Sequence, residues 1–442
     1  MKTIQIIFIS ILLSIFSLHA GAQKTKVLFL GNSYIYTNDL PVIFSKLSQS
    51  LGDTISYDQN TPGGYRFLNH ASSSTSISKI ASQNWDFVIL QAQSQEPSWP
   101  PSQIETEVFP YAKILVDSIR NNYTCTEPVF LLTWGRKYGD SYNCAAWPPV
   151  CSFSGMQERL TAGYMTMAME NNSTIAPAGL AWKHCMDNDT DSLINLYSSD
   201  NSHPAFSGSY LTSCVLYATI FRKSPVGSDY YGSLNQSDAM FLQQIAEEVV
   251  LKGNYNYYFY DDYTSYEYDL DWHNWFESGN LSYADYTFNQ NDLSISIENT
   301  SLNATTEVWS IDSLTYSAPI FTHTFTDYGS YLLEMTASNS CNQHLQDTTI
   351  IIESPNALES PIKQKMVVYP NPCSDYVHIK SNYEKLVLVE IYNSSGMLID
   401  SQTLSGRNQV DISTLKTGEY IFKVFIRDGN ENYQVLQKII KE

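Results

Sequence analysis

Short apolar runs alternate with longer helix-like segments over the first half of the chain, and this alternation limits the folds open to it. The runs VLFLG (27–31), FVILQ (87–91) and VFLLTW (129–134) are continuously hydrophobic, as strands covered on both faces are. Helical candidates lie between and after them, at residues 40–51, 76–83, 106–121, 155–171, 207–221 and 238–252. This alternation predicts an open parallel sheet between helices, with ligands bound beyond the carboxyl ends of the strands.

The pattern changes beyond this α/β region, which we place at residues 24–252. Residues 253–291 are aromatic and acidic without a clear period, and we interpret them as a connecting segment. Alternation with period two then predicts a small all-β sandwich at residues 292–353. Residues 354–365 carry two Ser-Pro pairs and are predicted to be a linker, and renewed alternation predicts a second β-sandwich at residues 366–442.

The N-terminus has the pattern of a secretory signal peptide. An early lysine, an apolar stretch at residues 6–18 and a small-x-small motif ending at Ala22 predict that residues 1–22 are removed. No later stretch approaches 18 consecutive apolar residues, so we expect no transmembrane segment in the mature chain. The 45 acidic residues outnumber the 25 basic ones, which argues against nucleic acid or acidic lipid as a partner.

Seven cysteines are present, and an exported chain permits disulfides among them. The odd number leaves at least one cysteine unpaired. A bridge between Cys144 and Cys151 is plausible, but pairing cannot be deduced from the sequence. No Cys or His spacing resembles a metal site, so we expect no metal and no cofactor.

Ser33 follows the first predicted strand, where it can be either a turn residue or a nucleophile. A serine nucleophile needs a base, and the base needs an orienting group. The α/β region offers only His70, His184 and His203. Asp200 precedes His203 by three residues, a spacing that lets a carboxylate hold Nδ1 while Nε2 faces outward. An isolated D-x-x-H pair is more often part of a helix cap. A catalytic role for Asp200 and His203 therefore depends on the other motifs of the chain.

The ordered set of motifs resembles the SGNH (GDSL-type) hydrolases, whose fold is a flavodoxin-like α/β/α sandwich with a parallel sheet. The resemblance covers residues 24–252 and rests mainly on FLGNSYIY (29–36) and DNSH (200–203). It implies that Ser33 is the nucleophile, that His203 is the general base and that Asp200 orients it.

The two middle motifs of the same family imply an oxyanion hole formed by Ser33, Gly64 and Gln93. The stretch TPGGYRF (61–67) supplies a backbone N–H, from Gly64 or alternatively Gly63. The third motif departs from the family's G-x-N-D, because QAQS follows the strand and Gln93 stands at the asparagine position. A glutamine amide can donate the same hydrogen bond, but packing would have to fix its extra rotatable bond.

The segment that follows the next predicted strand offers two candidates for substrate binding. Trp134 and Arg136 lie in LTWGRKYGD (132–140), beyond the carboxyl end of that strand. The alternative is a structural tryptophan beside a surface arginine.

Two further resemblances concern the rest of the chain. The stretch at residues 307–341, with a tryptophan in one strand and Y-G-x-Y-x-L-x-M-T-A later, resembles a PKD-type immunoglobulin-like domain, which implies a spacer or adhesive role. The tail, with YPNP (369–372) and GEY (418–420), resembles the C-terminal sorting domain of the type IX secretion system of Bacteroidota. Together with the signal peptide, this implies export to the surface or the exterior, with the type IX secretion machinery as a partner.

The sequence therefore predicts a secreted SGNH-type serine hydrolase that cleaves carboxylic esters, with O-acetyl groups of carbohydrates as a candidate substrate. A competing hypothesis is a non-catalytic adhesin or glycan-binding protein built on a degenerate hydrolase domain. The altered third motif favours that hypothesis, whereas the intact Ser33, Asp200 and His203 argue against it. Thioester hydrolysis or acyl transfer to a sugar would use the same three residues.

Overall fold

The computed structural model describes residues 24–189, 193–252, 257–261, 266–270, 275–277, 279–352, 366–369, 373–381, 385–393, 398–403, 409–428 and 431–441. The predicted signal peptide (1–22) and linker (354–365) lie outside these residues, and the predicted connecting segment (253–291) lies partly outside them. These boundaries therefore stay predictions. No helix in the described part of the chain combines the length and the apolar character needed to cross a bilayer.

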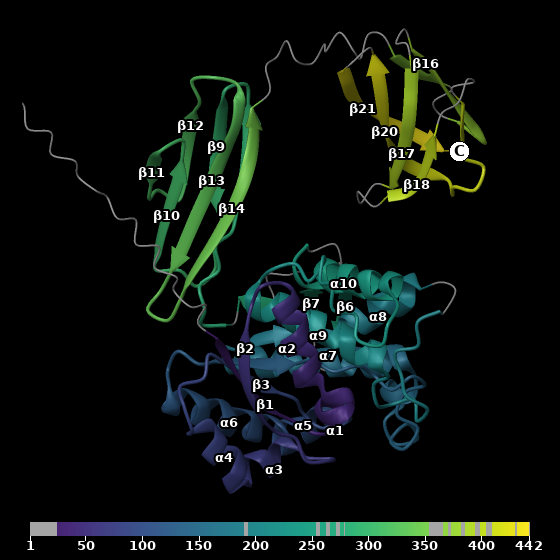
Figure 1. Ribbon diagram of the computed structural model, residues 1–442. Coiled ribbons are helices and arrows are strands. Elements are labelled where there is room, and N and C mark those ends of the chain that lie inside the picture. Colours follow the sequence, from purple (N-terminus) through teal and green to yellow (C-terminus); the bar gives the residue numbers. More distant parts are fainter. Residues whose placement is uncertain are drawn as a thin grey trace, which may run out of the picture.

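A five-stranded parallel sheet forms the centre of the α/β domain (Figure 1). Its strands are β1 (Thr25–Leu30), β2 (Ile55–Asn60), β3 (Phe87–Leu90), β4 (Glu127–Leu131) and β5 (Thr174–Ala176). They lie in the order β2-β1-β3-β4-β5, and each neighbouring pair is parallel. This is the flavodoxin-like order, which confirms the predicted fold class for this domain.

Two groups of helices cover the sheet. The helices are α1 (Ser33–Tyr36), α2 (Leu40–Ser50), α3 (Phe67–Ser72), α4 (Ser74–Ile80), α5 (Pro101–Glu107), α6 (Phe109–Asn122), α7 (Phe153–Glu170), α8 (Ala178–Asn188), α9 (Phe206–Phe221) and α10 (Gln236–Val250), with 3-10 turns η1 (Thr37–Asp39), η2 (Glu96–Ser98) and η3 (Pro148–Cys151). Helix α9 packs on α2, α8 and α10, whereas α6 packs on α3, α4 and α5. In Figure 1 the sheet runs between these two groups. Every residue of α9 from Ser207 to Ile220 is buried, as expected for a helix that is enclosed on all sides.

The first all-β region is a sandwich of two antiparallel sheets. Its strands are β8 (Tyr286–Asn291), β9 (Ser294–Asn299), β10 (Thr306–Ile311), β11 (Leu314–Tyr316), β12 (Ile320–Thr324), β13 (Gly329–Ser338) and β14 (Gln343–Ile352). The sheets have the orders β11-β10-β13-β14 and β12-β9-β8. Ile297 from one sheet and Trp309 and Leu333 from the other are fully buried in one shared core. This confirms the predicted β-sandwich and places the predicted tryptophan at its centre.

The second all-β region, at the C-terminal end, has the same two-sheet construction. Its strands are β15 (Met366–Tyr369), β16 (Tyr376–Ser381), β17 (Lys385–Asn393), β18 (Leu398–Thr403), β19 (Gln409–Asp411), β20 (Gly418–Asp428) and β21 (Glu431–Lys441), in the orders β15-β16-β19 and β18-β17-β20-β21. Val377 and Val410 share a core with Val389 and Phe422 of the other sheet. A separate two-stranded sheet, β6 (Tyr257–Asp261) and β7 (Tyr266–Leu270), lies within the predicted connecting segment.

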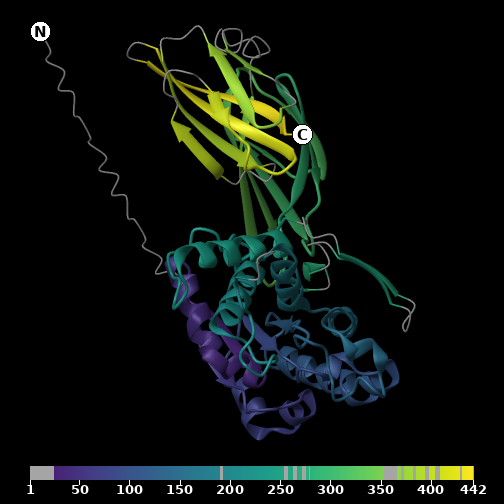
Figure 2. The same cartoon turned by 90° about the vertical axis from the view of Figure 1, so that its right-hand side faces the viewer.

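Two disulfides form among the described cysteines. Cys144 pairs with Cys151, as the sequence made plausible, and Cys125 pairs with Cys341 across 216 residues. The second bridge joins the α/β domain covalently to the first β-sandwich, whose attachment at one end of that domain is visible in Figure 2. The remaining three cysteines, Cys185, Cys214 and Cys373, are buried and take part in no disulfide.

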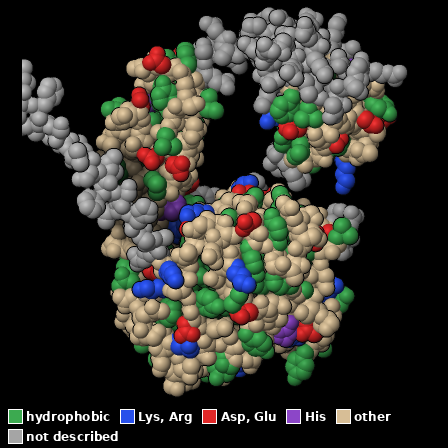
Figure 3. All heavy atoms as spheres, viewed as in Figure 1, with side chains coloured by type: hydrophobic (Ala, Val, Ile, Leu, Met, Phe, Trp, Pro, Cys, Tyr) green, Lys and Arg blue, Asp and Glu red, His purple; other side chains and the backbone are tan. Residues whose placement is uncertain are grey.

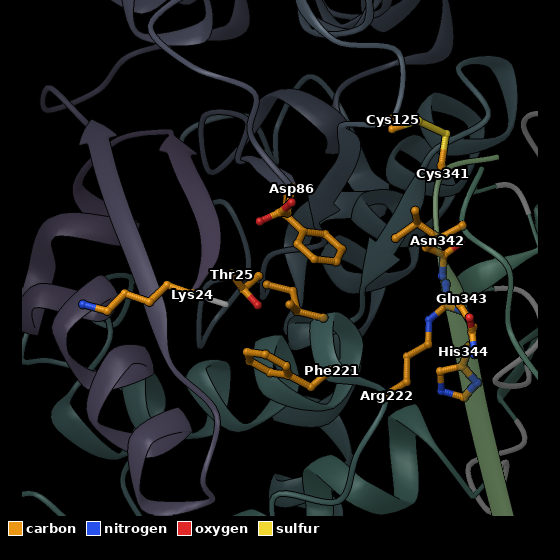
Figure 4. A pocket seen from close by; sticks show the side chains of 13 residues that line it. Lys24, Thr25, Asp86, Cys125, Phe221, Arg222, Cys341, Asn342, Gln343 and His344 are labelled. Carbon is orange, nitrogen blue, oxygen red and sulfur yellow. A yellow bond between two sulfur atoms is a disulfide. The ribbon is translucent and has the colours of Figure 1, made fainter. Parts of the chain in front are cut away.

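The contact between these two domains forms a partly open cavity of about 340 Å³ (Figure 4). Phe221 and Arg222 line it from the α/β domain, and residues 342–344 line it from the sandwich. The Arg222 guanidinium lies 4.6 Å from the ring centre of Tyr283, and its Nη1 donates a 3.0 Å hydrogen bond to the Ser282 carbonyl. Thr25 and Phe87, at the starts of β1 and β3, also line this cavity. The sandwich is therefore joined to the amino ends of the strands, and the carboxyl ends are left for the site described next.

Candidate active site

Ser33 is the first residue of helix α1, directly beyond the carboxyl end of β1. Asn32 caps this short helix, because its Oδ1 accepts the Tyr34 N–H at 3.1 Å. The Asn32 amide also donates to the Tyr65 carbonyl at 2.9 Å, which links the turn to the segment that carries Gly64. The Ser33 N–H is one of the helix-terminal donors without an intrahelical acceptor.

Two buried side chains that the sequence did not identify as part of the site fix this turn. Gln91, at the end of β3, accepts the Asn32 N–H with its Oε1 at 2.9 Å. Nε2 of His70 lies 2.9 Å from the Gly31 carbonyl, and Nδ1 lies 2.9 Å from Ser76 Oγ. Since a carbonyl only accepts, Nε2 carries the proton and the serine hydroxyl donates to Nδ1. A Cβ at Gly31 would lie only 2.6 Å from Gln91 Oε1, so the close approach requires glycine.

We expect the neutral His70 to make stability depend on pH. Burial lowers the pKa of His70 to about 4, while the hydrogen bond to Gly31 opposes this. In the unfolded chain His70 titrates near its ordinary value of about 6.5. The unfolded state therefore binds the extra proton between these values, and stability should fall by about 3 kcal/mol as pH drops from about 6.5 to about 4. Urea unfolding at several pH values measures this.

A His70→Gln variant provides the comparison, because glutamine can still donate to Gly31 and accept from Ser76 but does not titrate. Its stability should depend less on pH in the same window. Burial raises the pKa of Glu96 to about 7, which gives stability the opposite pH dependence, but this contribution is common to both proteins. Equal pH dependence in the two proteins would contradict the expectation.

The structure brings Ser33, His203 and Asp200 into one hydrogen-bonded chain. His203 Nε2 lies 2.8 Å from Ser33 Oγ, and His203 Nδ1 lies 2.5 Å from Asp200 Oδ2. Asp200 Oδ1 accepts the backbone N–H groups of Ser202 and His203 at 3.0 and 2.9 Å. Burial acts to raise the pKa of Asp200, but the hydrogen bonds from His203 and from these two amides outweigh it and lower the pKa. The carboxylate is thus held ionised beside the imidazole.

Trp134 is buried and packs against residues that neighbour Ser33 and His203. Its ring is stacked between Tyr34, at a centroid distance of 4.7 Å, and Trp182, at 4.0 Å. Its Nε1–H donates to the Ser202 carbonyl at 3.0 Å, and only 1% of the residue is exposed. Tyr34 in turn lies 2.8 Å from Ser202 Oγ through its hydroxyl. Of the two alternatives for Trp134, the structural one therefore describes this conformation.

The candidate oxyanion donors come from two loops that contact each other. Gly64 is exposed and has a positive φ of 69°, a conformation that favours glycine. Two residues later, Arg66 forms an ion pair with the buried Glu96 and lies 5.1 Å from the ring centre of Trp99. Glu96 N–H donates to the Gln93 carbonyl at 3.1 Å, so the loop with Gly64 is tied to the segment with Gln93.

Arg136 lies at the edge of this region. Its Nη1 is 3.4 Å from Oδ1 of the buried Asp140, and its side chain is 27% exposed. Among the described residues, its buried Nε has no hydrogen-bond partner. Arg136 thus has one guanidinium donor that none of the described contacts uses.

Comparison with known proteins gives one family match and several structural likenesses. Residues 367–442 match the family model described as a secretion system C-terminal sorting domain, which indicates secretion to the cell surface or exterior. No curated protein matches the chain. The predicted tail, and with it the predicted localisation, are confirmed.

The structural likenesses cover the α/β domain and the first sandwich separately. A protein from Slackia heliotrinireducens assigned to the SGNH hydrolases is 22% identical, with 45% of this chain and 99% of that chain covered and a TM-score of 0.37. A DUF4886 family protein from Bacteroides uniformis is 15% identical, with 51% and 94% covered and a TM-score of 0.43. The PKD1 domain of Vibrio anguillarum Epp is 18% identical, with 17% and 96% covered and a TM-score of 0.16. These are similarities of fold, and they leave the chemistry to the site itself.

Proposed function

We propose that the α/β domain is a serine hydrolase that cleaves carboxylic esters outside the cell. The observation that carries this proposal is the unbroken chain from Ser33 Oγ through the His203 imidazole to the Asp200 carboxylate, with contacts of 2.8 and 2.5 Å. A turn residue alone would not need a histidine base with its own oriented carboxylate. These three hydrogen-bonded side chains lie beyond the carboxyl end of β1, where ligands bind in open α/β sheets.

The proposed reaction passes through an acyl-enzyme. Ser33 Oγ attacks the ester carbonyl carbon while its proton moves to His203 Nε2, and the carbonyl oxygen becomes an oxyanion. The N–H groups of Ser33 and Gly64 and the amide of Gln93 are the proposed donors to that oxygen. When the intermediate collapses, the C–O bond to the alcohol breaks and the imidazolium returns the proton to the leaving oxygen. Water then attacks the acyl carbon while His203 Nε2 takes its proton. The C–O bond to Ser33 breaks as the imidazolium returns the proton to Ser33 Oγ, and the carboxylic acid is released.

Asp200 has two tasks in this scheme. Its Oδ2 accepts the Nδ1 proton of His203 and so selects the tautomer whose Nε2 can accept a proton from Ser33. Its negative charge also stabilises the imidazolium that forms during each step. The backbone amides of Ser202 and His203 hold the carboxylate in place for both tasks.

We propose O-acetyl groups on carbohydrates as the candidate substrate. The Lys137 N–H donates to the Asn201 carbonyl at 3.0 Å, so the loop after β4 lies beside the loop that carries His203. Tyr138 and Tyr142 on this loop are 70% and 86% exposed, and such rings offer apolar faces with a polar tip to a sugar. Arg136 is the proposed polar contact at the same edge.

Labelling with a fluorophosphonate tests the proposed nucleophile without knowledge of the natural substrate. The mature protein should form a covalent adduct, and mass spectrometry of the digested protein should place it on Ser33. A Ser33→Ala variant should remain unlabelled. An unmodified wild-type protein, or an adduct on another serine, would reject the proposal.

The alternative function is carbohydrate binding without catalysis, and the replacement of asparagine by Gln93 is the observation that favours it. In that case the exposed tyrosines would bind glycans while Ser33 remained unreactive. This alternative would be supported if the wild-type protein bound an acetylated xylan but did not react with the fluorophosphonate.

A further inference from the structure

We infer that Asp140 and Gln95 are positioning residues that fix the orientation of the Gln93 carboxamide, so that one of its N–H groups is kept for the oxyanion. This inference rests on the proposed function, because it gives Gln93 a reacting partner. It answers the question that the sequence raised, namely how a glutamine with one more rotatable bond than asparagine can serve as a preorganised donor.

Asp140 is the fixed end of this arrangement. It lies on the loop after β4, and no part of it is exposed. Its Oδ2 accepts from Gln95 Nε2 at 2.7 Å and from Asn143 Nδ2 at 2.6 Å, and its Oδ1 accepts the Tyr142 N–H at 3.2 Å. Arg136 places a positive charge 3.4 Å from the same oxygen. Carboxylate oxygens accept hydrogen bonds, so Gln95 turns its NH₂ group, and not its oxygen, toward Asp140.

The orientation of Gln95 determines the orientation of Gln93. With its NH₂ on Asp140, Gln95 presents Oε1 to Gln93 Nε2, at 3.3 Å. The backbone N–H of Gln95 donates to Gln93 Oε1 at 2.8 Å. The oxygen and the nitrogen of the Gln93 amide are therefore both assigned by a neighbour, and a flipped amide would face two mismatched partners. One Nε2 hydrogen is engaged with Gln95, and the second is available for another acceptor.

The segment around Gln93 lies against the residues that precede and follow Ser33 in the chain, Asn32 and Tyr34. Gln91 holds the Asn32 N–H next to Ser33. Ser94 lies near the hydroxyl of Tyr34, the residue that follows Ser33. Gln93 lies between these two contacts, so its second N–H is held on a segment attached to the nucleophile turn. The contacts of Gln95 and Asp140 thus replace the stiffness that a shorter asparagine would have.

A double-mutant cycle on Gln93 and Asp140 tests this inference. The measurement is the rate of Ser33 modification by a fluorophosphonate, resolved into the maximal rate constant and the reagent concentration at half-maximal rate. Gln93→Ala should reduce the maximal rate constant by roughly 10²-fold, the value of one oxyanion donor. Asp140→Asn should reduce it by about 10-fold with the half-maximal concentration unchanged, because an amide at residue 140 accepts either end of Gln95.

The non-additivity of the two changes is the decisive result. If Asp140 acts through Gln93, adding Asp140→Asn to Gln93→Ala should cause no further loss. A matched control is Asp86→Asn, because Asp86 accepts the Lys26 N–H at the opposite end of the sheet, and its rate should equal that of the wild type. Should Asp140→Asn fail to fold, Gln95→Met removes the same link and enters the same cycle.

The other outcomes separate this inference from the proposed function. Labelled wild-type protein with unchanged rates in the Gln93 and Asp140 variants would overturn the positioning role and leave the hydrolase proposal intact. Multiplicative losses in the double variant would also overturn it, because they would show that Asp140 acts on the site by another route. Failure to label Ser33 in the wild-type protein would reject the hydrolase proposal itself, and the inference with it.

Discussion

Replacement of His203 by alanine is expected to reduce ester turnover by roughly 10⁴- to 10⁶-fold while the domain stays folded. Ser33 Oγ would lose the acceptor 2.8 Å away, and a serine hydroxyl without a base is a poor nucleophile at neutral pH. Ser33→Ala should have an equal effect, and the double variant should lose no more than either single variant. The measurement is kcat/KM for p-nitrophenyl acetate on the mature protein.

Loss of folding is not expected to contribute to the lost turnover of the His203→Ala variant. The His203 side chain is 36% exposed, so its removal opens no buried cavity and the unfolding midpoint should change little. His184→Ala is a matched histidine control, because His184 lies on α8 and contacts Glu248 on α10 at 2.9 Å. That variant should keep the wild-type kcat/KM. A His203→Ala protein with more than a tenth of wild-type turnover would exclude His203 as the general base.

The sequence allowed prediction of the central strands but not of the sheet's edges. The strands β1, β3 and β4 are buried on both faces, so each appears as an apolar run that composition alone distinguishes. The edge strand β2 reads ISYDQN and is only partly buried, while the other edge, β5, has only three residues. Neither gives a clear hydrophobic signal. The strand order, which decides the fold class, therefore had to come from the resemblance and then from the structure.

The candidate site divides in the same way between local and distant information. Asp200 and His203 are close in sequence and follow a recognisable spacing, so the sequence could pair them and propose Ser33 as their partner. The contacts of Gln91 and His70 to the nucleophile turn span 59 and 39 residues and rest on hydrogen bonds to the backbone, which no residue pattern reveals. The stacking of Trp134 between two rings is likewise a property of packing, so the sequence left both of its alternatives open.

The disulfide between Cys125 and Cys341 is expected to contribute more stability than the bridge between Cys144 and Cys151. The first closes a separation of 216 residues and the second a separation of 7. In the chain-entropy model, the first bridge raises the free energy of the unfolded state by about 5 kcal/mol and the second by about 2 kcal/mol. Replacing both cysteines of each pair by serine, in two separate variants, and measuring urea unfolding without reductant compares the two contributions directly.

The longer disulfide should matter for stability much more than for activity. Noncovalent contacts also hold the two domains together, since the Asn280 N–H donates to buried Glu127 at 3.1 Å and Arg222 donates to the Ser282 carbonyl at 3.0 Å. These contacts lie at the amino ends of the strands, away from Ser33. The Cys125/Cys341 variant should therefore react with a fluorophosphonate at the wild-type rate when folded. If it instead unfolds no more easily than the Cys144/Cys151 variant, the α/β domain and the sandwich unfold independently and the bridge adds nothing to their common stability.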